Sequence, residues 1–170
     1  MDDSVRLVDP APEHLPILMS WITAKDQCEQ WGGPLFRYPF TRESFREDCR
    51  WGELAGGALV GGDGELLAFG QYYLRRDRCH FGRLIVSPAH RGLRLGEELV
   101  RELARKGCEE LGAEECSLFV LKDNAAAQAL YDRLGFARAD YPEPFDWLDQ
   151  CEYLVAPAGA LCGPAVSNTL

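Results

Sequence analysis

Apolar residues recur along the chain with two different periods, and the first fifty residues follow the helical one. Val5–Val8 reads as a short strand, and Pro12–Thr23 reads as a helix with Leu15, Leu18, Met19 and Ile22 on one face. Residues 30–40 are rich in aromatic residues, glycine and proline, which is typical of a loop. Thr41 is placed to cap a helix that runs to about Arg50. This part of the chain therefore predicts one strand and two helices.

The period then changes to that of strands separated by turns. Ala58–Val60 and Leu66–Leu74 are strand-like and flank the glycine-rich turn Gly61–Gly64. Phe81–Val86 is a further apolar run, and Ser87-Pro88 ends it. These runs predict a meander of strands in the middle of the chain.

Two helices and three strands complete the pattern. In chain order they are a helix at Gly96–Leu111, a strand at Glu115–Leu121, a helix from the Asn124 cap to about Leu134, and strands at Phe136–Tyr141 and Gln150–Val155. The order predicts an α/β (α+β) fold with a mixed, mostly antiparallel central sheet of about 6–7 strands flanked by about 4 helices. Phe81–Leu121 would be a crossover unit whose loop lies where open sheets bind ligands.

Length and composition fit one domain over residues 1–156, followed by an uncharged tail at 157–170. No apolar run reaches the roughly 18–20 residues that span a bilayer, and the acidic start Met1-Asp2-Asp3 is unlike a signal peptide. The 7 cysteines are an odd number without a CxxC motif, which argues against a disulfide framework and against a zinc site. We therefore expect a cytoplasmic protein with reduced thiols, no metal and no membrane partner.

Charge is unevenly placed along the chain. The formal net charge of −9 argues against a nucleic-acid partner. Six arginines and one acid between Arg75 and Arg94 give +5, so the other residues carry −14. Either these arginines decorate an exposed strand edge, or they belong to an anion site. The second interpretation suits a small anionic cofactor and a cationic substrate.

The segment His90–Gly96, with the sequence HRGLRLG, links an apolar strand to an amphipathic helix. Glycines at such a junction leave backbone N–H groups aimed at one point, and the positive end of the helix dipole favours a phosphate there. Glu97 follows Gly96 where a Walker A loop needs Lys-Ser/Thr, and the third glycine of a Rossmann fingerprint is missing. The segment alone predicts a phosphate-bearing ligand without naming it.

Two segments together resemble the hallmarks of one enzyme family. Residues 84–96, LIVSPAHRGLRLG, resemble the acyl-CoA loop of the GNAT family of N-acetyltransferases, and residues 124–136, NAAAQALYDRLGF, resemble its N-x-x-A-x-x-LY-x-x-x-GF motif. The resemblance covers Ala58–Phe136 strongly and the N-terminal helices by their order only. It departs from the family at Arg94, which stands in place of the middle glycine. Arginine is tolerable there if its φ is helical and its side chain points away or onto a phosphate.

The resemblance implies that acetyl-CoA donates its acetyl group directly to a primary amine of a small molecule or protein, without an acyl-enzyme. It assigns the pyrophosphate to the loop backbone with Arg91 and Arg94, the pantetheine amides to a strand backbone, and the leaving thiolate to Tyr131. Asn124 would cap its helix and lie near the cofactor. The expected acetyl-CoA-binding residues are Leu84, Ile85, Val86, Arg91, Gly92, Leu93, Arg94, Leu95, Gly96, Glu97, Asn124 and Tyr131.

The general base and the acceptor pocket are less sharply indicated. His80 titrates in the right range for a catalytic base, although a lone histidine on a strand is more often structural. Asp77 and the acids of the first two helices are further candidates. Trp31, Phe36 and Tyr38 would line the acceptor pocket, or would instead cover the core.

Two rival functions remain open from the sequence. One is transfer of a different acyl group, or to a different acceptor, on the same fold. The other is a CoA-binding regulatory module without turnover. Tyr131 beside an intact loop favours the enzyme, since a pure binder does not need the phenol. The expected partner is an amine-bearing molecule, and a homodimer is a further option.

Overall fold

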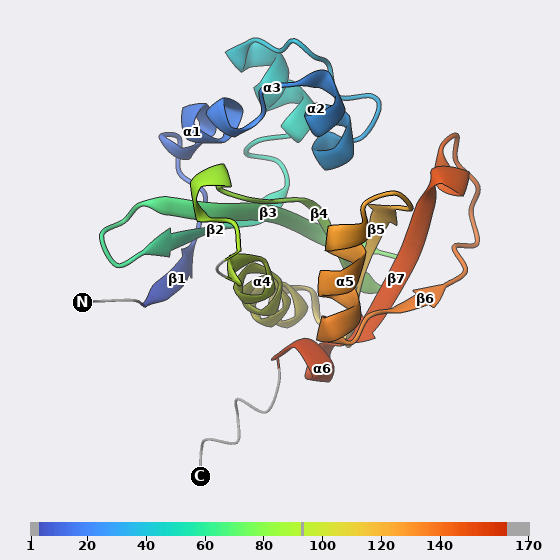
Figure 1. Cartoon of the computed structure of the whole chain (residues 1–170). Coiled ribbons are helices and arrows are strands. Elements are labelled where there is room, and N and C mark those ends of the chain that lie inside the picture. The colour runs from blue at the N-terminus through green and yellow to red at the C-terminus, as the bar shows by residue number, and fades with distance from the viewer. Residues whose placement is uncertain (1–3, 93, 163–170) are drawn as a thin grey trace. The chain divides into compact units, whose positions relative to one another are not determined.

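The computed structural model describes residues 4–92 and 94–162 of the chain. Figure 1 shows their strands and helices. In chain order these are β1 (Val5–Val8), α1 (His14–Trp21), α2 (Lys25–Gly32), α3 (Arg42–Cys49), β2 (Ala55–Gly61), β3 (Leu66–Arg75), β4 (Arg78–Val86), η1 (Pro88–His90), α4 (Leu95–Leu111), β5 (Glu115–Leu121), α5 (Ala125–Leu134), β6 (Ala137–Ala139), η2 (Leu148–Gln150), β7 (Cys151–Pro157) and α6 (Ala158–Cys162).

The seven strands form a sheet in the order β1-β2-β3-β4-β5-β7-β6. The β1–β2, β5–β7 and β6–β7 pairs are antiparallel, whereas β4 and β5 are parallel, with Cys79 opposite Cys116 and His80 opposite Ser117. Parallel neighbours need a crossover connection, and α4 supplies it. The mixed, mostly antiparallel fold expected from the sequence is confirmed.

The chain forms two compact units. The first comprises Met1–Gln71 and Arg83–Leu99, and the second comprises Tyr72–Gly82 and Val100–Leu170, so β3, β4 and α4 each contribute to both. The expectation of a single domain over residues 1–156 stays a prediction. Among the described residues, no helix has the length and apolarity that crossing a membrane requires.

The core of the first unit lies among α1, α2, α3 and the strands β2 and β3. The helices α1, α2 and α3 form one group at the top of Figure 1. Leu15, Leu18 and Phe45 are completely buried in this core. Thr41 begins α3 with a reciprocal cap, because its Oγ1 accepts from the Ser44 N–H at 3.0 Å while the Ser44 Oγ accepts from the Thr41 N–H at 2.9 Å. The cap expected at Thr41 is confirmed.

The helix α2 corrects the prediction of a loop that begins at residue 30. Only Cys28 of this helix is buried, so the apolar periodicity that marks an amphipathic helix is nearly absent. Polar contacts support it instead. Lys25 and Glu29 form an ion pair at 3.2 Å, and the Gln27 Oε1 accepts from the Thr23 N–H at 2.9 Å. With α2 and α6, the described residues contain six α-helices rather than about four.

The second unit is built from the strands β5, β6 and β7 with α5, α6 and most of α4. β5 has the bounds that the sequence predicts and pairs along its length with β7. α6 lies in the segment expected to be a tail, and its Leu161 is completely buried. The Leu161 carbonyl accepts from the Arg101 Nη1 at 2.9 Å. The start of the tail is therefore docked, while residues 163–170 lie outside the described residues.

Candidate functional site

The strand β4 leaves regular strand geometry at Arg83. This residue has a φ of 53°, in the left-handed region that non-glycine residues rarely adopt. Leu84, Ile85 and Val86, the residues expected to pair with pantetheine, follow directly and are half-buried in the first unit. A left-handed residue interrupts the repeat of ladder hydrogen bonds in a strand. The conformation of Arg83 therefore decides which way the backbone groups of the next three residues face.

The turn after β4 leads into the first turn of α4, as the sequence predicts. The Ser87 Oγ accepts from the Ala89 N–H at 3.3 Å and lies 3.1 Å from the His90 Nδ1, which fixes the short helix η1. The Arg91 Nε donates to the Val86 carbonyl at 3.3 Å. Gly92 follows with a φ of 87°, and apart from its two chain neighbours no atom of the described residues lies within 4 Å of where a side chain would begin. Leu93 lies outside the described residues.

Arg94 adopts a φ of 62°. The sequence makes arginine tolerable here if its φ is that of a right-handed helix, and this condition is not met. The position instead has the left-handed conformation that glycine adopts most easily. Its side chain is 82% exposed, and its Nη1 lies 3.9 Å from the Glu97 carboxylate. Leu95 and Gly96 begin α4, whose first turn also contains Glu97 and Glu98. Arg91 and Arg94 thus place exposed positive charge beside a helix N-terminus, where Arg94 also offsets the charge of Glu97.

The second motif forms α5 in the second unit. The Asn124 Oδ1 accepts from the Ala127 N–H at 3.3 Å, and Gly135 ends the helix with a φ of 102°. Tyr131 lies on this helix with 9% of its surface exposed, and its ring packs edge-on against Phe136 with the centroids 5.7 Å apart. Burial raises the pKa of Tyr131 to about 12. The phenol therefore keeps its proton throughout the physiological pH range.

His80 lies on the part of β4 that belongs to the second unit. It is 3% exposed, its Nδ1 lies 2.8 Å from the Ser117 Oγ, and its ring contacts Tyr73 and Phe119 with centroids 5.4 and 5.1 Å away. Burial, and then the charge of Arg75, lower the pKa of His80 to about 3. A buried neutral imidazole with such a low pKa is a weak base, so this environment favours a packing role.

The aromatic residues expected at the acceptor pocket pack into the core of the first unit. Phe36 is 5% exposed, and Trp31 and Tyr38 are half-buried around the same cluster. Trp31 stacks on Phe45 with centroids 5.5 Å apart, and Phe36 meets Phe45 edge-on at 5.4 Å. Leu35, in contrast, is 88% exposed. Phe36 therefore belongs to the core, which is one of the two roles that the sequence left open for it. Its neighbour Leu35 is instead exposed at the surface of this segment.

The structure also shows the surroundings of two acids that the sequence offers as general bases, Asp48 and Asp77. Asp48, on the second helix that the sequence predicts, accepts from the Arg37 N–H at 2.9 Å and from the Arg37 guanidinium at 2.9–3.3 Å. These hydrogen bonds lower the pKa of Asp48. Asp77 lies in the turn between β3 and β4 with a φ of 62°. A carboxylate that is already neutralised by arginine is a poor base, which leaves Asp48 with a structural role.

A network around Arg83 was missed by the sequence analysis. The Arg83 Nη1 donates to the Gln71 Oε1 and its Nη2 donates to the Asp48 carbonyl, each at 3.0 Å. The Gln71 Nε2 donates to the Cys49 carbonyl at 2.8 Å. The arginine lies 12 residues from Gln71 and 35 from Asp48 in sequence, so no local motif could have indicated these contacts.

Three cysteines of the second unit also come together from separate elements. The sulfur atoms of Cys79, Cys108 and Cys116 lie within 4.8 Å of one another, and those of Cys108 and Cys116 are 3.3 Å apart. Such a set offers donors to a soft metal. Burial raises the pKa of Cys108 to about 12, however, and the neighbouring Cys79 and burial raise that of Cys116. Protonated thiols oppose metal binding, and the expected absence of a metal stays a prediction.

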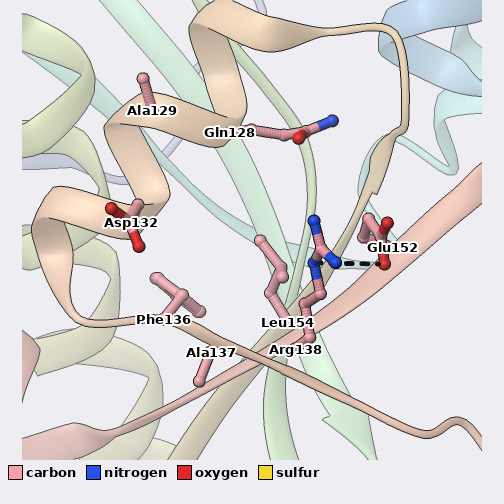
Figure 2. A pocket seen from close by; sticks show the side chains of 8 residues that line it. All are labelled: Gln128, Ala129, Asp132, Phe136, Ala137, Arg138, Glu152 and Leu154. Atoms are coloured by element: carbon pink, nitrogen blue, oxygen red, sulfur yellow. Dashed lines mark ion pairs between the residues drawn. The ribbon is translucent and has the colours of Figure 1, made fainter.

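A hollow of about 380 Å³ lies in the second unit, outside the residues named by the motifs. Figure 2 shows Arg138 and Glu152 side by side in its lining, with the Arg138 Nε 3.7 Å from the Glu152 carboxylate. Its lining comes from α5 and from the strands β6 and β7. The lining residues are Gln128, Ala129, Asp132, Phe136, Ala137, Arg138, Glu152 and Leu154. The ion pair neutralises Arg138 and Glu152, while Asp132 is a further charged residue of the lining.

Comparison with known proteins gives these features a family. The model of the acetyltransferase (GNAT) family matches residues 25–136, which include both motifs. A relative from Bacillus subtilis (strain 168), provisionally named a ribosomal protein bS18 alanine N-acetyltransferase, is 31% identical over 100 residues. That match covers 59% of this chain and 66% of the relative, just under two thirds of its length.

Solved structures show the same fold at lower identity. The spermidine N-acetyltransferase from Vibrio cholerae in complex with CoA and spermine has a TM-score of 0.71 at 14% identity, covering 94% of this chain and 98% of that one. The ribosomal-protein-S18-alanine N-acetyltransferase from Escherichia coli has a TM-score of 0.62 at 23% identity, covering 91% and 94%. With the family model matching more than half of its length, the chain belongs to the GNAT family of acetyltransferases.

Proposed function

We propose that this protein transfers the acetyl group of acetyl-CoA directly to a primary amine. The observation that carries the proposal is the turn from Arg91 to Arg94, which leads from β4 into α4 in a chain of the GNAT family. In the reaction a nitrogen–carbon bond forms, the carbon–sulfur bond breaks, and the amine gives up one proton while the CoA sulfur takes one. The chain therefore has to hold the pyrophosphate, orient the thioester and stabilise the leaving sulfur.

The turn supplies the groups for the first task. The N–H groups that begin an α-helix have no acceptor within the helix, and the helix dipole adds positive potential there. The open space beside Gly92 lets a ligand approach the backbone closely. Arg91 and Arg94 are both exposed and add two charge-assisted donors. A pyrophosphate is the ligand group that this combination fits best.

The strand residues Leu84, Ile85 and Val86 are proposed to pair with the pantetheine amides as an added strand would. The left-handed Arg83 supports this role, because it breaks the regular ladder just before the three residues whose backbone groups are needed. Asn124 holds the start of the helix that carries Tyr131, through its bond to the Ala127 N–H. Each task then rests on a rigid element rather than on a long loop.

Tyr131 is proposed to donate its hydroxyl proton toward the leaving sulfur. With a pKa of about 12, the phenol is roughly a thousandfold weaker acid than an ordinary thiol with a pKa of about 8.5. Complete proton transfer from Tyr131 to a free thiolate would therefore be uphill in this environment. A hydrogen bond that strengthens as negative charge develops on sulfur is the better description.

The acceptor that we propose is the α-amino group of a protein. The relative with 31% identity is named for an alanine amine of a ribosomal protein. An α-amine with a pKa near 7.7–8.0 is about a tenth neutral at pH 7, whereas an amine with a pKa of about 10.4 is almost wholly protonated. Because His80 is buried and Asp48 is paired with Arg37, an acceptor that needs little help from a base suits this chain.

A polyamine is the second candidate, and one observation favours it. The connection between β6 and β7 contains Asp140, Glu143, Asp146 and Asp149 but no basic residue. Arg76 pairs with Glu143 at 3.1 Å, and the other three acids would attract a cation. The likeness to the spermidine enzyme extends to the fold alone, at 14% identity. Transfer of another acyl group, or CoA binding without turnover, are the remaining alternatives.

The test is release of free CoA thiol from acetyl-CoA in the presence of chosen amines. A short peptide with a free N-terminal alanine, the same peptide with its amine already acetylated, and spermidine form the panel. The proposal predicts thiol release and one added acetyl group only with the free peptide. Turnover with spermidine alone would replace the acceptor, and acetyl-CoA binding without turnover on any amine would favour a binding module.

A further inference from the structure

The first unit contains a polar network that joins β4 to the end of α3. The network also reaches the aromatic segment at residues 30–40, which precedes α3 in the chain. Its centre is the Arg83 guanidinium, which donates to Gln71 and to the Asp48 carbonyl. The guanidinium also lies over the Phe36 ring, 6.0 Å from its centroid. Arg83 therefore touches three parts of the first unit while its own backbone belongs to β4.

The network satisfies groups that the helix α3 cannot satisfy itself. The last carbonyls of a helix have no intrahelical donor and carry the negative end of the helix dipole. Here the Arg83 Nη2 donates a hydrogen bond to the Asp48 carbonyl. The Nε2 of Gln71, a residue that is 2% exposed, donates to the Cys49 carbonyl at 2.8 Å. Two side chains of the sheet thereby fix the end of α3.

The Asp48 carboxylate continues the connection to the aromatic segment. It accepts from the backbone and guanidinium of Arg37, which stands between Phe36 and Tyr38. The segment expected at the acceptor side is thus attached to α3 through Arg37, and α3 is attached to β4 through Arg83. All these residues belong to the first unit.

Two features of Arg83 are locally unfavourable, one in its backbone and one in its side chain. Its φ of 53° is strained for a residue with a side chain, and its Nε is buried without a hydrogen-bond acceptor among the described atoms. Strain of this kind concentrates where a residue serves function rather than stability. The strained residue here directly precedes the strand segment Leu84–Val86.

We propose that Arg83 is a positioning residue for the acceptor side of the reaction. Its side chain holds the segment 33–49 against β4, the strand proposed to bind the pantetheine of acetyl-CoA. The acceptor amine would then be held at a fixed position relative to the thioester. The proposal rests on the proposed function for its kinetic consequence. The anchoring of segment 33–49 by Arg83 is independent of any substrate and can be measured separately.

Glycine at position 83 separates the side chain from the backbone. Arg83→Gly keeps the left-handed conformation, which glycine adopts freely, and deletes the guanidinium. Arg50→Gly is a matched control, since Arg50, the residue after α3, has the same φ of 53°. Within the described part of the chain, its side chain makes one exposed ion-pair contact, with Glu53 at 3.4 Å. Arg83→Lys retains the charge with a single donor head and serves as the conservative variant that tests rescue.

With the N-terminal alanine peptide, Arg83→Gly should raise the KM for peptide about tenfold, leave kcat within about threefold and leave the acetyl-CoA Kd within about twofold. Arg83→Lys should recover part of the loss, and Arg50→Gly should match the wild type. An unchanged peptide KM, or an acetyl-CoA Kd that rises as much as the peptide KM, would overturn the acceptor-side role.

Hydrogen–deuterium exchange tests the anchoring without a substrate. Amide exchange in residues 33–49 should rise about tenfold in Arg83→Gly and stay at the wild-type rate in Arg50→Gly. Unchanged exchange in Arg83→Gly overturns the proposal even if the enzyme turns over. If wild-type protein acetylates no amine, the proposed function fails, and a local rise in exchange would still establish that Arg83 anchors the segment.

Discussion

Replacing Arg94 by glycine should stabilise the protein, although it deletes a charged residue from the turn. A non-glycine residue in the left-handed region costs about 1–2 kcal/mol, and Arg94 has a φ of 62°. Glycine loses more backbone freedom on folding, which returns roughly 0.5–1 kcal/mol of that gain. The ion pair with Glu97 is long, at 3.9 Å, and the Arg94 side chain is 82% exposed, so its loss contributes little.

The net expectation for Arg94→Gly is a rise of about 0.5–1 kcal/mol in the free energy of unfolding. For a chain of this length that corresponds to roughly 1–3 °C in Tm. Urea denaturation followed by circular dichroism, with Tm from calorimetry, measures both. Affinity for acetyl-CoA should fall by up to about 1 kcal/mol, because one charge-assisted contact to the pyrophosphate is removed.

Gly92→Ala is the opposite change in the same turn. Beyond its chain neighbours, a side chain there would meet no described atom within 4 Å, so the substitution tests backbone strain at a φ of 87°. It should lower the free energy of unfolding by about 1–2 kcal/mol. If Arg94→Gly lowers the free energy of unfolding and Gly92→Ala leaves it unchanged, backbone strain at these two positions has no effect on stability. That result would contradict both predictions.

Two further predictions concern residues away from the turn. Thr41→Ala should cost about 1 kcal/mol in the free energy of unfolding, measured in urea, because it removes the acceptor for the Ser44 N–H at the start of α3; a loss below about 0.3 kcal/mol would contradict the role of the cap. The pKa of His80 is about 3 in the folded chain against about 6.5 when free, so its contribution to stability is complete above pH 6.5 and is lost as the pH falls toward 3. His80→Gln should therefore show a smaller fall in Tm between pH 7 and pH 5 than the wild type, and a displaced pH profile of kcat/KM in this variant would instead restore His80 as the base.

The elements predicted from the sequence correctly are those that carry a local signal. Thr41 and Asn124 are found as caps because a single side chain in each case accepts a nearby backbone N–H. β5 is found with its observed bounds because Glu115–Leu121 is a mostly apolar segment of strand length. The helix α2 is missed because its support is polar and only Cys28 is buried.

The features that escaped prediction depend on contacts distant in sequence. The pKa of His80 follows from burial beside Phe119 and Ser117, which lie on a different strand. The contacts of Arg83 reach α3 and β3, and its left-handed φ in a strand has no sequence signature. The sequence indicates the acyl-CoA loop at residues 84–96 but not its backbone conformation, since the left-handed φ of Arg94 has no sequence signal.

We propose that this protein acetylates an amine with Tyr131 at the leaving sulfur. The most direct test compares wild type, Tyr131→Phe and Tyr153→Phe for acetyl transfer to the N-terminal alanine peptide, with product mass and acetyl-CoA Kd measured for each. Tyr153 is a suitable control because it is also buried in the second unit, where its hydroxyl accepts from Arg78.

We expect acetylated peptide from wild type and near-normal kcat in Tyr153→Phe. In Tyr131→Phe we expect kcat to fall roughly 10–100-fold while the acetyl-CoA Kd stays within about twofold. A wild-type rate in Tyr131→Phe would remove the tyrosine from the reaction. Absence of acetylated product from wild type with every amine tested would contradict the proposed acetyltransferase activity.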